Sequence, residues 1–320
     1  MSEIVIIGAG AWGTALALQA TRAGHHVALV ARGQGSCSTL LASRENPRLP
    51  GFRLPDTIEL RPDIPVSAEL LLWAVPTQYL RSSLSRLGPT GGAIVVCAKG
   101  VEAATHLLPL EVVTDVLGAR PLGVLTGPNF AHEVAKGLPA ATVVASTDAG
   151  LRERVRVGLG TGTFRLYGND DPIGAQLGGA AKNVIAIAAG AVIGRGLGEN
   201  ARAALVTRGI SELCRLAVAL GGRAETVMGL SGLGDLLLTC TGSSSRNFSL
   251  GHALGRGDSL ENILAKRSAV TEGVATAAAL VARSRGIELP ICRAVADLLA
   301  GVMTLDQAIG QLMSRPQRDE

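Results

Sequence analysis

The chain has 320 residues, of which 47% are apolar and 18% are charged, and its formal net charge is +4. At about 150 residues per domain, this length predicts two globular units, each large enough to bury its own core. The small charged fraction excludes a disordered chain. The longest apolar run, residues 184–193, is interrupted by Gly190 and is shorter than the ~18 apolar residues that a membrane span needs. We therefore expect a soluble protein with no membrane span.

The charges and cysteines exclude several classes of partner and ligand. Lysine and arginine rarely occur in runs and aromatic residues are scarce, which argues against a nucleic-acid partner. The five cysteines are scattered without a C-x-x-C spacing, so we expect reduced thiols and no metal site. No basic segment precedes the first apolar stretch, as a signal peptide would require. A cytoplasmic location is the resulting expectation.

Short apolar runs alternate with helical spacing along the first half of the chain. A helix is predicted over residues 11–23. Strands are predicted over residues 3–7, 27–31, 70–75, 93–97, 123–125, 142–145 and 164–167. Nearly continuous apolar strands that alternate with helices predict a mainly parallel sheet covered on both faces, the doubly wound Rossmann type of α/β fold. Residues 46–65 contain five prolines and are predicted to form a loop.

From about residue 170 the spacing becomes helical throughout. A long helix that is apolar on most sides is predicted to begin at Pro172 and to end at Ile193, as the buried centre of a second unit. Further helices are predicted over residues 201–219, 223–228, 260–264, 276–284, 294–300 and 305–313. We therefore expect a dinucleotide-binding domain over residues 1–178 and an all-α domain over residues 179–320. The apolar helices could bury a homodimer interface or belong to the core, and the sequence leaves both open.

A glycine motif follows the first predicted strand. Gly8, Gly10 and Gly13 fit the pattern G-x-G-x-x-G, and a second strand follows the helix that the motif opens. In this motif the first glycine permits a tight turn, the second lets the backbone approach a pyrophosphate, and the third allows helix and strand to pack closely. The sequence predicts a dinucleotide site here, with an ordinary glycine-rich turn as the alternative.

Arg32 stands at the end of the second strand, where an acidic residue would accept hydrogen bonds from the ribose hydroxyls of NAD. A guanidinium can instead pair with the 2′-phosphate of NADP, so this residue favours NADP over NAD. A solvated arginine at a strand end is the alternative.

Only four of the 30 basic residues are lysines, and one of them, Lys182, lies in the long apolar helix. Burial lowers the pKa of a lysine towards neutrality, which would let this amine donate and accept a proton. A lysine at the helix edge that extends its ammonium into water is the alternative.

A candidate anion site follows further along the chain. Asp235 comes after a glycine-rich turn, and residues 239–247 form a hydroxyl-rich segment that ends in Arg246 and Asn247. Hydroxyls, backbone N–H groups, a guanidinium and an amide together suit a phosphate monoester. We predict a loop that binds phosphate, with a plain linker as the alternative.

An ordered set of motifs resembles the bacterial type of NAD(P)-dependent glycerol-3-phosphate dehydrogenases. The motifs lie within residues 3–312 and are GAGAWGTALA, VPTQ, AKG, GPNFAHEVAKGLP, GAAKNVIAIAAG, AALVTRG, GLSGLGDLLLTCT, SRN and EGVATA. The resemblance implies reversible reduction of dihydroxyacetone phosphate to sn-glycerol 3-phosphate with NAD(P)H, which supplies glycerophospholipid synthesis.

The resemblance also implies roles for individual residues. Lys182 would be the general acid/base, Asp235 would hold it or the substrate hydroxyl, and Lys99 would face both nicotinamide and substrate. The substrate would contact Lys99, Gly127, Asn129, Lys182, Asp235, Ser245, Arg246 and Asn247. The cofactor would contact Gly8, Gly10, Ala11, Trp12, Gly13, Arg32, Lys99, Ala131, Arg246, Val270 and Glu272. No metal is needed for this reaction.

Two positions depart from the bacterial pattern. Asn129 stands where serine or threonine is common, and Gly33 stands where a second basic residue often follows the position of Arg32. Ketopantoate and 3-hydroxyacid reductases also carry a lysine on a long interdomain helix and are the enzymatic alternative. A non-catalytic NADP sensor is a further alternative, which would need neither Lys182 nor Asp235.

Overall fold

The computed structural model describes residues 3–65, 68–87, 92–242, 244–266, 271–284 and 286–316. By its internal contacts the chain divides into two compact units. The sheet unit comprises Met1–Lys99 and Leu108–Gln176, and the helical unit comprises Gly100–Leu107 and Leu177–Glu320. The last division lies close to the boundary expected from the sequence. The short segment Gly100–Leu107, in contrast, joins the helical unit although it follows a strand of the sheet.

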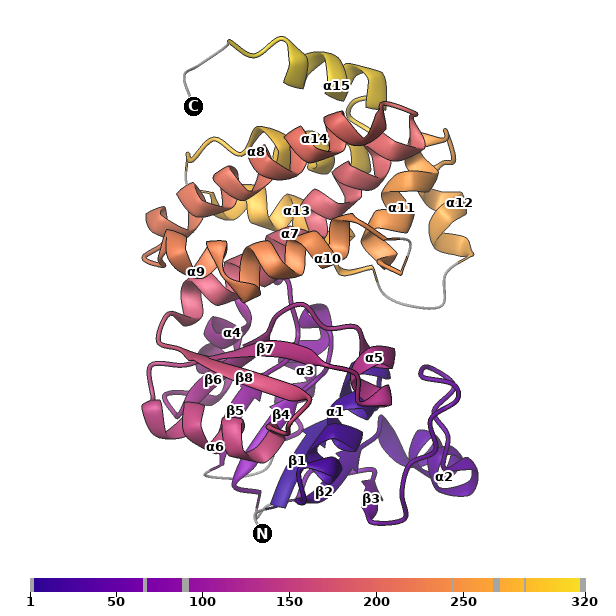
Figure 1. Cartoon of the computed structure of the whole chain (residues 1–320), viewed down its shortest axis with the longest axis vertical. Helices are drawn as coiled ribbons and strands as arrows, with labels where there is room; N and C mark the ends of the chain where they lie inside the picture. Colours follow the sequence, from indigo (N-terminus) through magenta and orange to yellow (C-terminus); the bar gives the residue numbers. More distant parts are fainter. Residues whose placement is uncertain are drawn as a thin grey trace. The chain divides into compact units, whose positions relative to one another are not determined.

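The sheet unit is built on one sheet of eight described strands in the order β3-β2-β1-β4-β5-β6-β7-β8 (Figure 1). The strands are β1 (Glu3–Ile7), β2 (His26–Val30), β3 (Ile58–Arg61), β4 (Leu70–Trp73), β5 (Ala93–Val96), β6 (Leu122–Thr126), β7 (Ala140–Ala145) and β8 (Phe164–Asn169). Neighbouring strands are parallel except β6 and β7, which are antiparallel. The mainly parallel sheet predicted from the sequence is confirmed.

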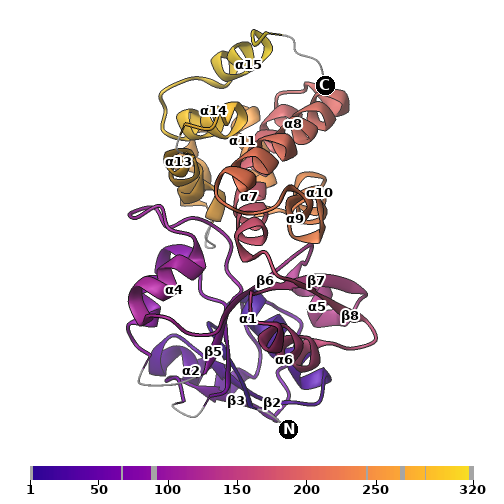
Figure 2. The same ribbon diagram turned by 90° about the vertical axis from the view of Figure 1, so that its left-hand side faces the viewer.

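Helices cover both faces of this sheet. Helix α1 (Ala11–Arg22) packs against α5 (Ala131–Lys136) and α6 (Ala149–Leu159), whereas α3 (Leu80–Leu84) packs against α4 (Pro109–Leu117). Figure 2 shows α4 and α6 on opposite sides of the sheet. Every residue of β4 and β5 is buried, because neither face of these central strands meets water. This explains why the strands are apolar at successive positions.

The segment predicted to be a proline-rich loop contains a strand. Ile58–Arg61 forms β3, which pairs in parallel with β2 and lies beside helix α2 (Gly33–Ser43). The prediction of a loop over residues 46–65 is therefore wrong at these four residues. Ile58 and Leu60 are buried and alternate with charged residues, as in a half-buried edge strand. All five prolines lie outside the strand. Because they are so frequent in the segment, the alternation of apolar and charged residues over four positions is hard to recognise in the sequence.

Helices make up the regular structure of the helical unit in its described part. They are α7 (Pro172–Gly194), α8 (Gly198–Ala219), α9 (Ala224–Met228), α10 (Asp235–Cys240), α11 (Arg246–Gly255), α12 (Leu260–Ala265), α13 (Glu272–Arg283), α14 (Pro290–Leu299) and α15 (Leu305–Met313). The all-helical second half predicted from the sequence is confirmed. The sequence analysis predicts no helix at α10 or α11, and its loop over residues 239–247 overlaps the end of α10 and the start of α11.

Helix α7 is the centre of the helical unit. Residues 174–192 are buried without exception, and helices α8, α10, α11 and α13 lie around α7 in both views (Figures 1 and 2). Within the described residues, α7 is the one helix long and apolar enough to cross a membrane. Of its most apolar window, however, 89% is buried inside the protein. This is the environment of a core helix, and it explains why α7 is apolar on all sides.

A buried carboxylate joins α8 to the start of α14. Glu212 is 2% exposed and accepts hydrogen bonds from the backbone N–H of Ile291 at 2.8 Å and of Cys292 at 3.3 Å. Both N–H groups belong to the first turn of α14, where they have no acceptor within the helix. Burial raises the pKa of Glu212, while the N–H donors and Arg215 act in the opposite direction. The carboxylate thus anchors the N-terminus of α14.

We predict that Glu212→Gln changes how stability depends on pH. A carboxyl group whose pKa is raised by folding contributes stability that is fully present below its ordinary value of 4.5. That contribution is lost as the pH rises through the raised pKa of the native state. The difference in urea unfolding midpoint between the unaltered chain and the variant should therefore favour the unaltered chain more at pH 5 than at pH 8. The same difference at both pH values would contradict the prediction.

Candidate active site

The glycine motif lies at the carboxyl end of β1, where the strand order reverses between β2 and β4. Gly8 has a φ of +107°, and a Cβ there would lie 2.9 Å from the carbonyl oxygen of Ala74. A Cβ on Gly13 would lie 2.0 Å from the carbonyl oxygen of Gly8. Around Gly10, by contrast, a Cβ would meet no described atom within 4 Å. Close packing therefore requires the outer glycines, and the middle one leaves room for a ligand at the backbone.

Helix α1 begins at this turn without a side-chain cap. Gly10 is the N-cap residue and makes no side-chain cap hydrogen bond, and among the described residues no other side chain is seen to accept one from the first turn. Ala11 and Trp12 are half-buried. The first N–H groups of a helix have no acceptor within it, and together with the helix dipole they attract an anion. The arrangement suits the pyrophosphate of a dinucleotide.

Arg32 lies two residues beyond β2 and is the N-cap residue of α2. Its side chain is exposed, and it forms no ion pair with the described residues. The next residue, Gly33, has a φ of +74°, so the backbone turns sharply into α2 at this point. The guanidinium is therefore accessible to an anionic ligand.

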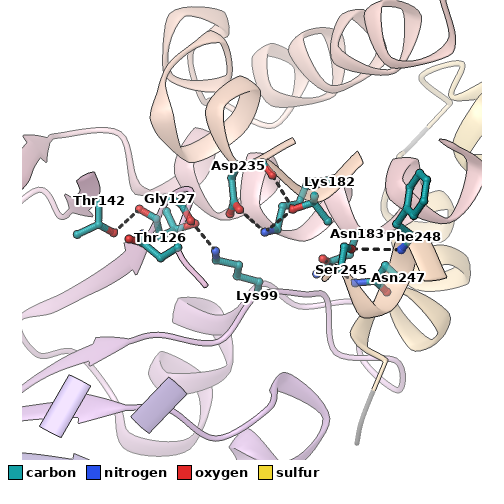
Figure 3. Close-up of polar contacts among 12 residues, drawn as sticks. Lys99, Thr126, Gly127, Thr142, Lys182, Asn183, Asp235, Ser245, Asn247 and Phe248 are labelled. Atoms are coloured by element: carbon teal, nitrogen blue, oxygen red, sulfur yellow. Dashed lines mark hydrogen bonds and ion pairs between the residues drawn. The ribbon is translucent and has the colours of Figure 1, made fainter. Parts of the chain in front are cut away.

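Lys99 and its neighbours lie at the carboxyl ends of β5 and β6. The ammonium of Lys99 donates a hydrogen bond to the carbonyl oxygen of Gly127 at 3.0 Å (Figure 3). Gly127 has a φ of +146°, and a Cβ there would lie 3.1 Å from the backbone of Thr142. Asn129 donates a hydrogen bond to the carbonyl oxygen of Ala141 at 3.3 Å, whereas its Oδ1 is buried and has no partner among the described residues. The structure thus joins Lys99 to the loop that contains Gly127 and Asn129.

Lys182 is buried beside a carboxylate in the helical unit. Its side chain is 9% exposed, and its ammonium contacts the carboxylate of the fully buried Asp235 (Figure 3). The ammonium also donates a hydrogen bond to the hydroxyl of Thr239 at 3.0 Å. That hydroxyl donates its own proton to the carbonyl oxygen of Asp235 at 2.6 Å, which leaves its lone pairs for the ammonium. Lys182 is therefore a buried, paired cation and does not extend into water.

Gly232 and Gly178 let the turn before α10 pack closely against α9 and α7, respectively. Leu230–Gly234 is a π-helical turn, a geometry that occurs frequently at functional sites. A Cβ on Gly232 would lie 1.9 Å from the carbonyl oxygen of Val227. A Cβ on Gly178 of α7 would lie 2.9 Å from the carbonyl oxygen of Ser231. The backbones of this turn and of α7 are thus in direct contact, one helical turn before Lys182.

Thr239 completes the lysine site, and the sequence analysis did not single it out. Asp235 and Thr239 lie four residues apart on α10 and share one face of the helix. Both side chains therefore reach Lys182 from the same direction. This spacing could have revealed Thr239, but the prediction of a loop from residue 239 removed the helical geometry on which the signal depends.

Hydrogen bonds hold Asn247 in the first turn of α11. Its Nδ2 donates to Oδ1 of Asn183, which lies beside it in Figure 3, at 2.8 Å. Its Oδ1 accepts from the backbone N–H of Gly273 at 3.1 Å. Ser245 is the N-cap of α11, and its hydroxyl accepts from the backbone N–H of Phe248 at 3.2 Å. The prediction of a loop is therefore wrong at its end, where serine caps a helix that begins at Arg246.

Asn183 is a second site residue that the sequence analysis did not single out. It follows Lys182 on α7 and is 4% exposed. Its Oδ1 accepts from Asn247, but its Nδ2 is buried and has no partner among the described residues. A buried donor without an acceptor is costly, so this amide group is suited to a ligand oxygen.

Paired glycines bring α7 and α11 together. Gly190 and Gly194 on α7 and Gly251 and Gly255 on α11 each have the spacing G-x-x-x-G. A Cβ on Gly251 would lie 1.9 Å from the carbonyl oxygen of Ile187. Since the distance between packed helices depends on the side chains at their contact, glycine allows the closest approach. This glycine seam places the first turn of α11 against α7.

Four residues predicted to contact the cofactor lie at the first position of a helix or outside the described residues. Arg246 is exposed and is the first residue of α11. Ala131 and Glu272 are half-buried and are the first residues of α5 and α13. Val270 lies outside the described residues. Cofactor contact at these four positions stays a prediction.

The thiols near these clusters are poor nucleophiles. Burial raises the pKa of Cys240, which follows Thr239, to about 12. Burial likewise raises the pKa of Cys97, which precedes Lys99 by two residues. Because the thiolate is the reactive form, neither side chain is activated near neutral pH. The described residues also contain no group of three His, Cys, Asp or Glu side chains that could hold a metal ion.

Comparisons with known proteins match the whole chain. The family models for the NAD-dependent glycerol-3-phosphate dehydrogenase N-terminus and C-terminus match residues 3–151 and 171–310. Proteins of Acidiphilium cryptum and Gluconobacter oxydans, both named NAD(P)+ glycerol-3-phosphate dehydrogenase, are 54% and 48% identical over 99% of this chain and 98% of their own lengths. The crystal structure of glycerol-3-phosphate dehydrogenase from Coxiella burnetii has a TM-score of 0.93 and 37% identity, and covers 98% of this chain and 99% of its own.

We predict that Gly251→Ala lowers stability, because its methyl group would overlap the carbonyl oxygen of Ile187. Overpacking of this kind costs about 1–3 kcal/mol. Thermal unfolding measures the loss. The matched control is Gly310→Ala in α15, where a Cβ meets no described atom within 4 Å and alanine should be neutral or stabilising. Equal stability of the two variants would contradict close contact at the glycine seam.

Proposed function

This chain belongs to the family of NAD(P)-dependent glycerol-3-phosphate dehydrogenases, and we propose that Lys182 is the general acid/base of its reaction. The activity of the family interconverts dihydroxyacetone phosphate and glycerol 3-phosphate. The proposal is carried by the contact of the Lys182 ammonium with Asp235 and Thr239 in a buried environment. Among the four lysines of the chain, Lys182 provides an amine that two neighbouring groups, the Asp235 carboxylate and the Thr239 hydroxyl, hold in one orientation.

The glycine turn of residues 8–13 fits a dinucleotide cofactor. The room beside Gly10 and the uncapped start of α1 support this assignment. When bound, NAD(P)H supplies the hydride that reduces C2 of the ketone. Arg32 would contact the adenosine side of the cofactor, and its charge favours a 2′-phosphate.

Lys182 would complete the reduction by protonating the substrate oxygen. An ammonium at hydrogen-bond distance from the substrate carbonyl oxygen would stabilise negative charge on that oxygen and donate a proton to it. Asp235 and Thr239 hold the amine in place for this step. In the reverse direction the neutral amine would accept the proton of the C2 hydroxyl.

The start of α11 would bind the phosphate of the substrate. Arg246 offers a guanidinium, and Asn247 has a second amide N–H besides the one donated to Asn183. Ser245 keeps its hydroxyl proton for a ligand, because its oxygen accepts the cap hydrogen bond. A phosphate held here would orient C2 for reaction, so binding energy far from the reacting carbon would assist the chemistry.

The loop of the sheet unit would contribute the remaining substrate contacts. Lys99 would hold a substrate oxygen, with its ammonium positioned by the hydrogen bond to the carbonyl oxygen of Gly127. Asn129 has a buried Oδ1 without a described partner, which suits a substrate hydroxyl as the donor. The Asn129 amide would therefore contact the substrate at a position where serine or threonine is common in the bacterial pattern.

Further parts of the proposal concern the setting of the enzyme. Glycerol 3-phosphate is the backbone of phospholipids, and we assign the enzyme to glycerophospholipid synthesis. The free state of all five cysteines supports a reducing cytoplasm. A homodimer is part of the proposal, and the exposed apolar side chains of Val218, Met228 and Leu237 are candidates for contact with a second copy.

The alternatives fit these clusters less well. A ketopantoate or 3-hydroxyacid reductase has no need of a guanidinium and an amide at a helix start to bind phosphate. A non-catalytic NADP sensor has no need of a buried lysine. Burying a charged side chain costs free energy even when a carboxylate pairs with it, so such a lysine points to a catalytic function.

We predict that Lys182→Ala abolishes turnover and leaves cofactor binding intact. Loss of a general acid/base lowers the rate by about 10²–10⁴-fold. Lys182→Arg should be equally inactive, because a guanidinium keeps the charge but does not release its proton near neutral pH. The measurement is the loss of nicotinamide absorbance after dihydroxyacetone phosphate is added to enzyme and NADPH.

The matched control is Lys136→Ala, which removes an exposed lysine at the end of α5 and should turn over normally. Near-normal turnover of Lys182→Ala would exclude this residue as the proton donor. Activity of Lys182→Arg close to that of the unaltered enzyme would show that only the charge is needed.

We also predict that NADPH binds more tightly than NADH and that Arg32→Ala removes the difference. A charge-assisted pair with the 2′-phosphate should contribute about 1.5–3 kcal/mol, or about 10–100-fold in affinity. Fluorescence titration of each cofactor measures the ratio, with Arg53→Ala as a control for loss of an exposed charge in the same unit. Equal affinities of the unaltered chain for both cofactors would remove Arg32 from this role.

A further inference from the structure

Asn46 is a buried polar side chain that the proposed function leaves without a role. It lies in the loop after α2 and is 2% exposed. Its Nδ2 donates one hydrogen bond to the carbonyl oxygen of Ala9 at 3.1 Å and another to the hydroxyl of Thr14 at 2.6 Å. Its Oδ1 accepts from the backbone N–H of Arg48 at 3.0 Å. The amide therefore connects a distant loop to the glycine turn.

The contact with Ala9 determines the orientation of one peptide group. The described chain has no cis peptide bond, so the Ala9–Gly10 peptide is trans and planar, and its C=O and N–H point in opposite directions. A carbonyl directed at Asn46 thus turns the N–H of Gly10 away from Asn46. Ala9 lies between two glycines, whose wide backbone freedom would otherwise let this peptide rotate. Asn46 removes that freedom.

The N–H of Gly10 belongs to the part of the turn that a pyrophosphate would approach. Gly10 is the N-cap of α1, where N–H groups without acceptors gather. A Cβ on Gly10 would meet no described atom within 4 Å, so a ligand can reach this backbone. Asparagine is neutral and orients the peptide without placing a negative charge near an anion.

The loop that carries Asn46 is itself well fixed. Glu45 and Arg53 form an antiparallel bridge, and the carboxylate of Glu45 accepts from the backbone N–H of Gly51 at 2.7 Å. Leu49 and Leu54 are buried in the core of the sheet unit. The loop that carries Asn46 is thus held in place by its own contacts. A ligand that binds at the glycine turn therefore loses little binding free energy in ordering this loop.

We propose that Asn46 is a positioning residue of the dinucleotide site, which orients the Ala9–Gly10 peptide so that the N–H of Gly10 binds the pyrophosphate. The inference rests on the proposed function in that the glycine turn must bind the cofactor. Asn46 itself touches neither cofactor nor substrate, and it acts through the backbone.

The test is the binding of three ligands to the full-length variant Asn46→Ala. NADPH and ADP-ribose both contain the pyrophosphate, and each should bind about tenfold more weakly, as loss of about one hydrogen bond implies. Adenosine lacks the pyrophosphate and should compete with NADPH at the same concentration as in the unaltered chain. The KM for NADPH should rise similarly, while kcat at saturating NADPH stays within about twofold.

Leu49→Ala is the matched control. It removes a buried side chain from the same loop and lowers stability, but it leaves the Asn46 amide in place. All three ligands should bind to it with nearly unaltered affinity. A second variant, Thr14→Val, removes the other acceptor of the amide and keeps the bond to Ala9, so its NADPH affinity should change by less than about threefold.

Three results would overturn the role of Asn46. They are unaltered NADPH binding by Asn46→Ala, an equal loss in Leu49→Ala, and an equal loss of adenosine and ADP-ribose affinity. Failure of the unaltered chain to bind NADPH is a different result, because it refutes cofactor binding and the inference together. Normal binding by the unaltered chain with no change in Asn46→Ala refutes the inference alone.

Discussion

The contact between Lys182 and Asp235 is the interaction on which the helical unit depends. Two opposite charges inside a protein are tolerable only when they lie close together and their remaining hydrogen-bonding groups are satisfied, since each loses its hydration. Thr239 meets this second condition for the ammonium. This pairing places a demand on the sequence, because the turn before α10 must approach α7 until their backbones are in contact. Gly178 permits that approach, because a Cβ there would lie 2.9 Å from the carbonyl oxygen of Ser231, so a glycine of α7 helps to determine where the charges meet.

Contacts between backbones recur wherever the structure places a functional group. Gly8 and Gly13 bring the first turn of α1 against β1 and the residues after β4, and the glycine seam brings α11 against α7. In each case a helix N-terminus results, at Gly10 in one unit and at Ser245 in the other. Both ends offer N–H groups suited to an anion. Asn46 and Asn247 are the amides that tie these two helix starts to distant segments.

Local patterns in the sequence predicted most of the fold and part of the site. Continuous apolar runs identified most of the sheet, because buried parallel strands need them, and the scarcity of lysine made Lys182 conspicuous. The sequence analysis missed the short strand β3, because only two of its residues point into the core and the five prolines around it are typical of a loop. The sequence analysis missed Asn46 for another reason, because Asn46 acts on Ala9 from 37 residues away and no local pattern records such a contact. Thr239 does have a local signal, its spacing of four residues from Asp235, which the predicted loop over residues 239–247 concealed.

The segment Gly100–Leu107 makes each unit discontinuous in sequence. It leaves the sheet unit directly after Lys99, and within the helical unit its His106 carbonyl accepts a hydrogen bond from Arg283 at 2.8 Å. Val101 and Glu102 of this segment are buried. A chain cut near residue 177 would therefore give a C-terminal fragment that lacks residues 100–107, which belong to its fold. The N-terminal fragment would keep this segment without the helices that it packs against. The two halves that the sequence suggests are not two independently separable proteins.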